Sequence, residues 1–259
     1  MSNTYTMKTP SQLHPHPIEQ LPPIRVRKLF RVLTSYYAIA LAIAIGCAWG
    51  FGWLATEVLE HEFTDANTAI LLAIHAQSTP ALDRLALLIT WFGSSLGVTV
   101  IGSVLVIVLL LMKRYVDLGT LAAVLIGATV LVLTFKLLFQ EVRPHVFEPL
   151  VPLTGFSFPS GHSLTSFSLW GFFAWWIVSF DPRQIWRWFL GALGLVIAVL
   201  VALSRLYLGV HWPTDVLAGM LLGFSWVSVC MTGQRWLTRH ARWERRRIRD
   251  RHAELSQSL

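Results

Sequence analysis

Charge is what this sequence has least of. Only 14% of the 259 residues are Asp, Glu, Lys or Arg, whereas 54% are hydrophobic. A soluble globular domain carries about 25% charged residues, so the composition argues against a protein that is soluble by itself. The few charges are also unevenly placed, because six long runs contain none: Val32–Thr56, Leu85–Met112, Leu118–Phe135, Leu164–Phe180, Trp188–Ser204 and Val216–Gln234.

The length of these runs points to a membrane. A helix needs about 20 apolar residues, within a range of about 17–25, to cross the hydrocarbon core of a bilayer. We therefore predict an all-α polytopic membrane protein with six transmembrane helices in one bundle. The first run is too long for the apolar core of a signal peptide, which has about 7–15 residues, and we expect it to be retained as the first span.

Cysteine is almost absent as well. Cys47 and Cys230 both lie inside predicted spans, and neither belongs to a C-x-x-C pair. This argues against metal or redox chemistry at these positions. We interpret both as small packing residues.

Polar sequence is confined to the two ends and the loops. Residues 1–23 are rich in Pro and His and predict a flexible cytoplasmic lead. We place the six-span domain at 24–235 and a basic cytoplasmic tail at 236–259. Segment 64–80 carries apolar residues at helical spacing and predicts a short helix on the membrane surface.

The positions of Lys and Arg predict the orientation of the spans. Cations precede the first span, follow the sixth, and occupy the loops after the second and fourth. By the positive-inside rule both termini are cytoplasmic, and the loops after the third and fifth spans are on the extracytoplasmic side of the plasma membrane. The net charge of +7 then reflects attraction to anionic headgroups, so we expect no nucleic-acid partner.

Three polar clusters interrupt the apolar background, each at the extracytoplasmic end of a predicted span. Ionisable groups at membrane depth are unfavourable and usually functional. In the first cluster, Lys136 and Arg143 are seven residues apart, which would put them on one helix face about 10 Å apart before Pro144 ends the helix. Two such cations predict an anion site; snorkelling side chains at a span end are the alternative.

The second cluster lies at the start of the fourth span. Pro159 and Gly161 predict a turn, and the N-terminus of the following helix offers backbone N–H groups to an anion. Ser160 can donate a hydrogen bond, and His162 can exchange a proton near neutral pH. The alternative is a capping serine beside a structural histidine.

The third cluster joins the fifth and sixth spans. His211 and Asp215 are four residues apart, so the carboxylate can hold one imidazole nitrogen and leave the other free to attack. Arg205 adds a third cation, and Pro213 suits the first turn of the sixth span. A structural His–Asp pair is the alternative.

Taken together, the clusters predict phosphoryl transfer. Fixed cations would stabilise charge on the phosphoryl oxygens while a nucleophile attacks in line. No acidic cluster suited to Mg²⁺ accompanies them in the sequence, so we expect no metal and no cofactor.

These residues resemble those of a known family. Lys136-x6-Arg143-Pro144, Pro159-Ser160-Gly161-His162 and Ser204-Arg205-x5-His211-x3-Asp215 match the three-part signature of the type-2 phosphatidic acid phosphatases. The resemblance implies that His211 attacks phosphorus to form a phosphohistidine, that Asp215 orients it, and that His162 protonates the leaving oxygen. It also implies which groups hold the phosphoryl oxygens: Lys136, Arg143, Ser160, Arg205 and the backbone N–H of Gly161.

Within that family the chain resembles bacterial phosphatidylglycerophosphatase B and the undecaprenyl pyrophosphate phosphatases. The resemblance implies a lipid phosphate as substrate, presented by the bilayer. Undecaprenyl pyrophosphate is favoured, and phosphatidic acid, phosphatidylglycerol phosphate and diacylglycerol pyrophosphate stay open. A lipid phosphotransferase would carry the same signature, and a lipid transporter using the basic site is the non-enzymatic alternative. The sequence does not specify the oligomeric state.

Overall fold

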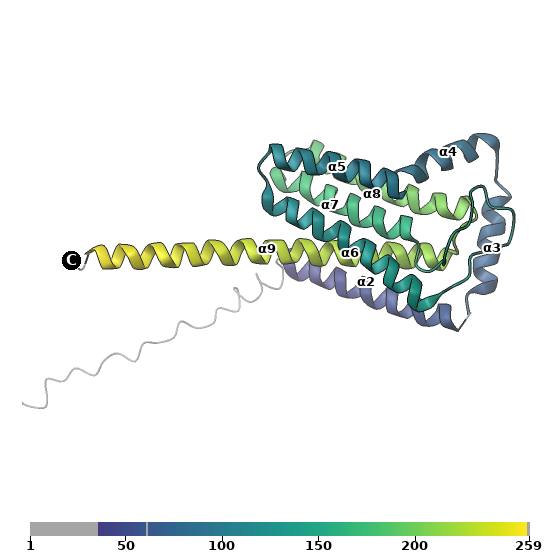
Figure 1. Cartoon of the computed structure of the whole chain (residues 1–259), viewed down its shortest axis with the longest axis horizontal. Coiled ribbons are helices and arrows are strands. Elements are labelled where there is room, and N and C mark those ends of the chain that lie inside the picture. Colours follow the sequence, from purple (N-terminus) through teal and green to yellow (C-terminus); the bar gives the residue numbers. More distant parts are fainter. Residues whose placement is uncertain (1–35, 61, 258–259) are drawn as a thin grey trace, which may run out of the picture. The chain divides into compact units, whose positions relative to one another are not determined.

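The computed structural model describes residues 36–60 and 62–257, and within them every regular element is a helix. The predicted lead at 1–23 and the cations before the first span lie outside the described residues. The helices are α2 (Tyr36–Leu59), α3 (Thr64–His75), α4 (Pro80–Trp91), α5 (Ser95–Leu111), α6 (Tyr115–Phe139), α7 (Gly161–Phe180), α8 (Ile185–Tyr207) and α9 (Pro213–Gln257) (Figure 1).

Most of these helices have the dimensions of membrane spans. Helices α2, α6, α7, α8 and the first part of α9 are each long and apolar enough to cross a bilayer. Helices α4 and α5 meet the same criterion only as a pair, bent by 48° at the break between them. If this pair is one span, the described residues hold six, and the prediction of an all-α multi-span protein is confirmed.

The charge-free run Leu85–Met112 was predicted as one helical span, but the structure breaks it between α4 and α5. Ser94 starts α5 by accepting the N–H of Gly97 on its hydroxyl at 3.1 Å. A Cβ on Gly93 would lie 2.3 Å from Val201 Cγ1 and 2.5 Å from Ser166 Oγ. Only glycine lets the break approach α7 and α8 this closely, and hydropathy alone does not register it.

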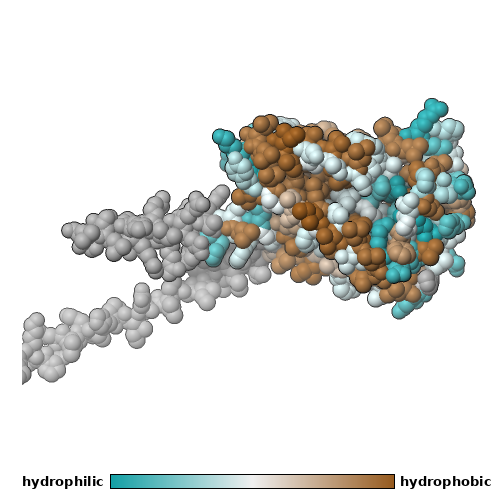
Figure 2. All heavy atoms as spheres, in the orientation of Figure 1, coloured by the Kyte–Doolittle hydropathy of each residue, from teal (hydrophilic) through white to brown (hydrophobic). Residues whose placement is uncertain are grey.

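Helix α7 is the centre of the packing. It contacts α5, α6, α8 and α9 (Figure 1), and Leu164, Leu169 and Phe172 on it are fully buried. Large apolar side chains on the outer helices, such as Val104, Leu133 and Phe189, are instead exposed, and Figure 2 shows apolar residues over much of one face. In a bilayer these exposed faces would meet lipid tails.

Helices α7 and α9 approach each other through two glycines. A Cβ on Gly219 would lie 2.6 Å from the carbonyl oxygen of Ser160, and one on Gly223 would lie 2.5 Å from that of Leu164. Small residues four apart let membrane helices pack at backbone distance. The contact brings the start of α7 against the first turns of α9, where two of the polar clusters lie.

Two further predictions concern elements at the edges of the bundle. The helix predicted within 64–80 is confirmed as α3, which packs against α8 and α9; its place on a membrane surface stays a prediction. Helix α9 continues without a break past residue 236, where we placed the start of the tail. The domain limits therefore also stay predictions.

The end of α6 differs from the prediction. The helix ends at Phe139, with Gln140 in the left-handed conformation (φ 48°) and its N–H donating to the carbonyl of Lys136. Arg143 is therefore in a loop and does not share a helix face with Lys136. A glycine usually marks such a left-handed cap, and here a glutamine takes the position, so the sequence carries no signal for it.

Candidate active site

The three polar clusters come together where α6 and α8 end and where α7 and α9 begin. Lys136 is in the last turn of α6, Arg205 is in the last turn of α8, and Asp215 is in the first turn of α9. Gly161 and His162 begin α7, and the remaining residues come from the loops at 140–160 and 208–212. The fold thus joins side chains that are up to 79 residues apart in the sequence, between positions 136 and 215.

His211 and Asp215 form a buried pair. The imidazole Nδ1 lies 3.3 Å from Asp215 Oδ2, and the two residues are 2% and 0% exposed. The backbone N–H of Trp212 donates to the same oxygen at 2.8 Å. The four-residue spacing therefore produces the predicted contact, within the turn that leads into α9.

The tautomer of His211 follows from its other neighbour. Arg143 Nη1 lies 3.2 Å from His211 Nε2. A guanidinium only donates hydrogen bonds, so Nε2 accepts and the proton of the neutral ring is on Nδ1, facing Asp215. The lone pair of Nε2 is thus directed toward the cations of the site.

Burial and charge keep this imidazole neutral. Burial, and then the positive charges of Arg143, Arg205 and Lys136, lower the pKa of His211 well below its ordinary value. Burial also lowers the pKa of Arg143, opposed by the charge of Asp215. A guanidinium starts from so high a pKa that it remains charged. The site therefore pairs a neutral nucleophile candidate with a permanent cation.

Lys136 and Arg143 meet at one loop carbonyl although they are not on one helix. Lys136 Nζ donates to the carbonyl of Phe156 at 2.5 Å, and Arg143 Nη2 donates to the same oxygen at 3.3 Å. Arg143 Nε also donates to the carbonyls of Thr154 and Gly155, at 3.1 and 3.0 Å. The backbone of 154–156 thus holds both cations beside His211.

Arg205 is the most deeply placed cation. It is only 7% exposed, and Nη1 donates to the hydroxyl of Thr90 at 2.8 Å. Its Nε is buried without a hydrogen-bond partner among the described residues. A buried donor on a charged group is strongly destabilising unless it is paired, so this atom points to an anionic ligand. Thr90, 115 residues away on α4, carried no signal in the sequence.

Ser160 caps α7, as the alternative interpretation of the second cluster proposed. It is 0% exposed, and its hydroxyl oxygen accepts from the N–H of Ser163 at 3.4 Å and from the Ser163 hydroxyl at 3.0 Å. Its own hydroxyl proton remains available to a ligand. The backbone N–H of Ser160 donates to the carbonyl of Asp215 at 3.0 Å, which ties the start of α7 to α9.

Gly161 and His162 form the first turn of α7. The His162 ring interacts electrostatically with Arg205, His211 and Arg143. It makes no hydrogen bond to any side chain or backbone group that the structure describes. Both nitrogens are therefore free to exchange a proton with a bound ligand.

Sequence reasoning missed one buried member of this site. Ser157 is fully buried; its hydroxyl donates to Asp215 Oδ2 and lies 3.4 Å from His211 Nδ1. It precedes the second cluster by two residues, in Ser157-Phe-Pro-Ser160. A serine in a loop is too common for its type alone to have identified it.

The part of the chain that holds the site is similar to a known protein family. Residues 117–239 match the model of the PAP2 superfamily, and this range contains all eight predicted site residues. The chain contains a PAP2 superfamily domain. The domain covers α6 to α8 and the first half of α9, so the three clusters and the helices that carry them belong to it.

Two curated relatives align with parts of this chain. The undecaprenyl-diphosphatase of Sulfolobus acidocaldarius is 39% identical over 132 residues, which is 46% of this chain and 56% of that protein. The phosphatidylglycerophosphatase B of Bacillus subtilis is 45% identical over 85 residues, which is 32% of this chain and 41% of that protein. The chain thus spans about half of the length of the curated relatives it matches.

Two solved structures resemble the fold more completely. The crystal structure of a transmembrane PAP2-type phosphatidylglycerolphosphate phosphatase from Bacillus subtilis has a TM-score of 0.61 at 28% identity, covering 74% of this chain and 96% of that one. The structure of LpxE from Aquifex aeolicus has a TM-score of 0.51 at 25% identity, covering 63% and 93%. Both extend the similarity beyond the PAP2 domain to the helices before it.

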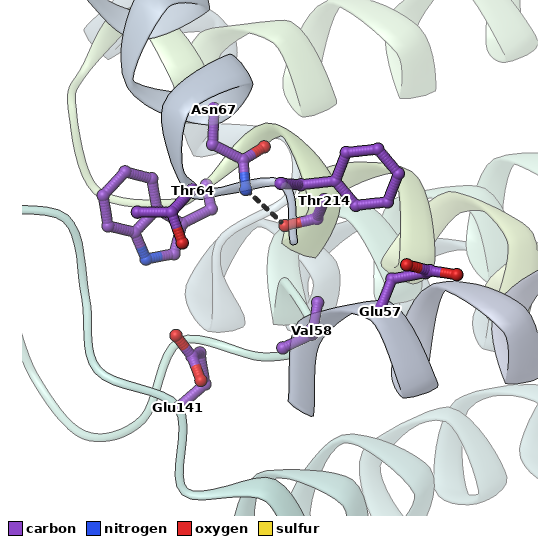
Figure 3. Close-up of a pocket in the computed structure, with 8 residues that line it drawn as sticks. Glu57, Val58, Thr64, Asn67, Glu141 and Thr214 are labelled. Carbon is purple, nitrogen blue, oxygen red and sulfur yellow. Dashed lines mark hydrogen bonds between the residues drawn. The ribbon is translucent and has the colours of Figure 1, made fainter. Parts of the chain in front are cut away.

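A pocket of about 110 Å³ (Figure 3) is lined in part by Trp212 and Thr214, which adjoin His211 and Asp215 in the sequence. At one wall the Asn67 amide donates to the Thr214 hydroxyl at 3.1 Å. The carboxylates of Glu57 and Glu141 also line it and would repel a phosphate. The cation cluster, and not this pocket, is therefore the candidate anion site. The full lining is Glu57, Val58, Phe63, Thr64, Asn67, Glu141, Trp212 and Thr214.

The pocket adjoins an acidic group. Glu57, Glu60 and Glu62 place one carboxylate oxygen each within 4.8 Å of the others, close enough to share a metal ion. This group belongs to the end of α2 and the residues after it, and none of the three predicted clusters contributes to it. The expectation that phosphoryl transfer here needs no metal stays a prediction.

Proposed function

We propose that the PAP2 domain of this chain hydrolyses the phosphate ester or anhydride of a membrane lipid through a phosphohistidine at His211. The observation that carries this proposal is the orientation of one imidazole. Nδ1 faces Asp215 at 3.3 Å, and Nε2 faces Arg143 at 3.2 Å. A neutral ring with its lone pair among fixed cations is poised to attack an anionic phosphorus centre.

In the first step, His211 Nε2 attacks phosphorus and the bond to the leaving oxygen breaks. His162, whose ring has no other described partner, donates a proton to that oxygen. Asp215 accepts the Nδ1–H bond throughout and stabilises the positive charge that develops on the ring. In the second step His162 removes a proton from water, which attacks the phosphohistidine and releases phosphate.

The cations and the start of α7 would hold the phosphoryl oxygens. Arg205 Nε, buried and unpaired among the described residues, offers one donor. Lys136 and Arg143 would exchange the carbonyls of 154–156 for the ligand, and the Ser160 hydroxyl and the Gly161 N–H would complete the set. Arg205 Nε, the Ser160 hydroxyl and the Gly161 N–H need no such exchange, and donors fixed before the reaction stabilise developing charge most effectively.

For the substrate we favour undecaprenyl pyrophosphate, with phosphatidic acid, phosphatidylglycerol phosphate and diacylglycerol pyrophosphate as the other candidates. The similarity to an undecaprenyl-diphosphatase and a phosphatidylglycerophosphatase supports this range. The distribution of Lys and Arg supports an extracytoplasmic site in the plasma membrane with both termini in the cytoplasm. A lipid could then reach the site laterally from the bilayer.

The test is phosphate release by the purified chain in mixed micelles with undecaprenyl pyrophosphate, phosphatidic acid or phosphatidylglycerol phosphate. We expect turnover of at least one lipid and a phosphoenzyme that resists base and is lost in acid, as a phosphoramidate is. His211→Ala should abolish both. Near-normal release by His211→Ala would overturn the assignment, and transfer of label to an acceptor lipid instead of water would identify a phosphotransferase.

A further inference from the structure

Ser157 contacts both members of the candidate nucleophile pair, His211 and Asp215. It lies in the loop before α7 and is 0% exposed. Its backbone N–H donates to the carbonyl of Glu141 at 2.8 Å, which ties it to the segment just after α6. A polar side chain with no access to water must find its partners within the protein.

The hydroxyl of Ser157 has one proton to donate, and its neighbours decide where it goes. An ionised carboxylate only accepts, so the hydroxyl donates to Asp215 Oδ2. Its oxygen then faces the Nδ1–H of His211 at 3.4 Å as an acceptor. Ser157, Asp215 and His211 therefore each contact the other two.

Three donors converge on one oxygen of Asp215. The Ser157 hydroxyl, the Trp212 N–H and the His211 Nδ1–H all meet Oδ2, whereas Oδ1 is buried without a partner among the described residues. The orientation of the carboxylate therefore depends on these three bonds. One of them, from Trp212, belongs to the backbone, so Ser157 is the contributing side chain that is not itself part of the predicted catalytic set.

We infer that Ser157 is a positioning residue for phosphoryl transfer. It holds the Asp215 carboxylate in the orientation that keeps the proton of His211 on Nδ1 and the lone pair on Nε2. This inference rests on the proposed function. Ser157 touches no reacting atom and acts through Asp215. A carboxylate that is held in place fixes the tautomer of the imidazole it contacts, here that of His211.

The same loop segment also carries the cation-binding carbonyls. Thr154, Gly155 and Phe156 accept from Arg143, and Phe156 also accepts from Lys136. The next residue along the chain is Ser157. The anchor of Ser157 on Asp215 thus sets the position of the carbonyls relative to the nucleophile, which couples the phosphate-binding cations to the His–Asp pair.

The first experiment compares Ser157→Ala with Ser228→Ala in the purified full chain. Ser228 is also a buried serine, 3% exposed, but its hydroxyl donates to the carbonyl of Phe224 in its own helix. For Ser157→Ala we expect kcat to fall about tenfold or more, because a hydrogen bond to a charged group is lost. KM should change less than threefold, and the inhibition constant for orthovanadate should rise with the loss of kcat.

The second experiment places Ser157→Ala in an Asp215→Asn background. If Ser157 acts through Asp215, it should reduce the residual kcat by less than twofold there, because the group it positions is already altered. A loss of the same size in both backgrounds would overturn the inference. So would an unchanged kcat for Ser157→Ala, or a loss of kcat matched by Ser228→Ala.

Thermal unfolding separates positioning from structural damage. Ser157→Ala and Ser228→Ala should shift the melting temperature by similar amounts, while only the first lowers kcat. Suppose instead that Ser157→Ala lowers the melting temperature much more than Ser228→Ala does, and regains normal kcat when assayed at a lower temperature. The residue would then have a structural role, and the inference would be overturned. Failure of the proposed function looks different, because the unsubstituted chain would then release no phosphate from any lipid.

Discussion

Arg143 and His211 face each other at 3.2 Å, from the guanidinium Nη1 to the imidazole Nε2. The lone pair proposed to attack phosphorus is therefore engaged by the cation proposed to bind the phosphoryl group. An arriving phosphate is a better acceptor for Arg143 than a neutral imidazole, because hydrogen bonds between charged groups are the stronger ones. Binding of the substrate would thus release the nucleophile at the moment it is needed.

Replacing Arg143 by lysine should test this arrangement. The substitution keeps the charge but removes the planar group that donates to Val210, Gly155 and His211 together. We expect kcat/KM to fall about 100-fold, comparable to the loss of one donor to a transition-state oxyanion. Arg183→Lys, in the loop between α7 and α8, is the matched control and should be neutral. Equal activity of the two variants would contradict the role of Arg143.

The pH dependence should reveal the neutral state of His211. Its pKa is lowered by burial and by three cations, and protonation would remove the attacking lone pair. Activity should therefore persist as the pH falls through about 6.5, the ordinary value for histidine, and be lost only below it. Lys136→Gln removes one of the cations and should move the acid limb of kcat/KM toward higher pH. A shift toward lower pH would contradict this electrostatic account.

His162 should be separable from His211 by the choice of leaving group. With p-nitrophenyl phosphate, whose leaving group needs little protonation, His162→Gln should still form the phosphoenzyme but hydrolyse it slowly. The phosphohistidine should accumulate to a level measurable by acid-labile label. His211→Gln should form none. If His162→Gln accumulates no phosphoenzyme with this substrate, the proposed division of roles is wrong.

Chelation should leave activity intact. The phosphoryl oxygens would be met by fixed side-chain cations, so we expect the same kcat with EDTA present. Glu57→Gln and Glu62→Gln, which alter the acidic group at the end of α2, should likewise have little effect on kcat. If the activity required Mg²⁺ and Glu62→Gln abolished that activity, the acidic group would take part in the reaction.

The contact between α7 and α9 should be sensitive to volume at one position. A Cβ on Gly219 would meet the Ser160 carbonyl at 2.6 Å, whereas one on Gly233, farther along α9, would meet nothing within 4 Å. Gly219→Val should therefore destabilise the protein by about 1–3 kcal/mol, the usual range for overpacking. Gly233→Ala should be neutral or stabilising by up to about 1 kcal/mol. Thermal unfolding in detergent would measure both, and equal effects would refute the close packing.

Much of the fold follows from the sequence because a bilayer imposes simple rules. Charge-free runs predicted α2, α6, α7, α8 and α9, and periodicity predicted α3. The break at Gly93 was not predicted, because it depends on side chains of α7 and α8 that the local sequence does not contain. The early end of α6 was missed because Gln140 replaces the usual glycine of a left-handed cap.

The candidate site divides in the same way. The spacing of His211 and Asp215 was enough to predict their contact, because both lie within one turn. Ser157 and Thr90 were missed, since each reaches its partner across a large separation in sequence, 58 residues to Asp215 and 115 residues to Arg205. Only the assembled bundle shows which ordinary serine and threonine are involved.

The glycine contact between α7 and α9 also bears on how such proteins diverge. The PAP2 domain, residues 117–239, comprises the helices whose backbones touch, and there a single added methyl group would displace Ser160. The outer surfaces of α5 and α6 need only be apolar. Exchanges between apolar residues can therefore accumulate on those surfaces without disturbing the backbone contact that holds the candidate site together.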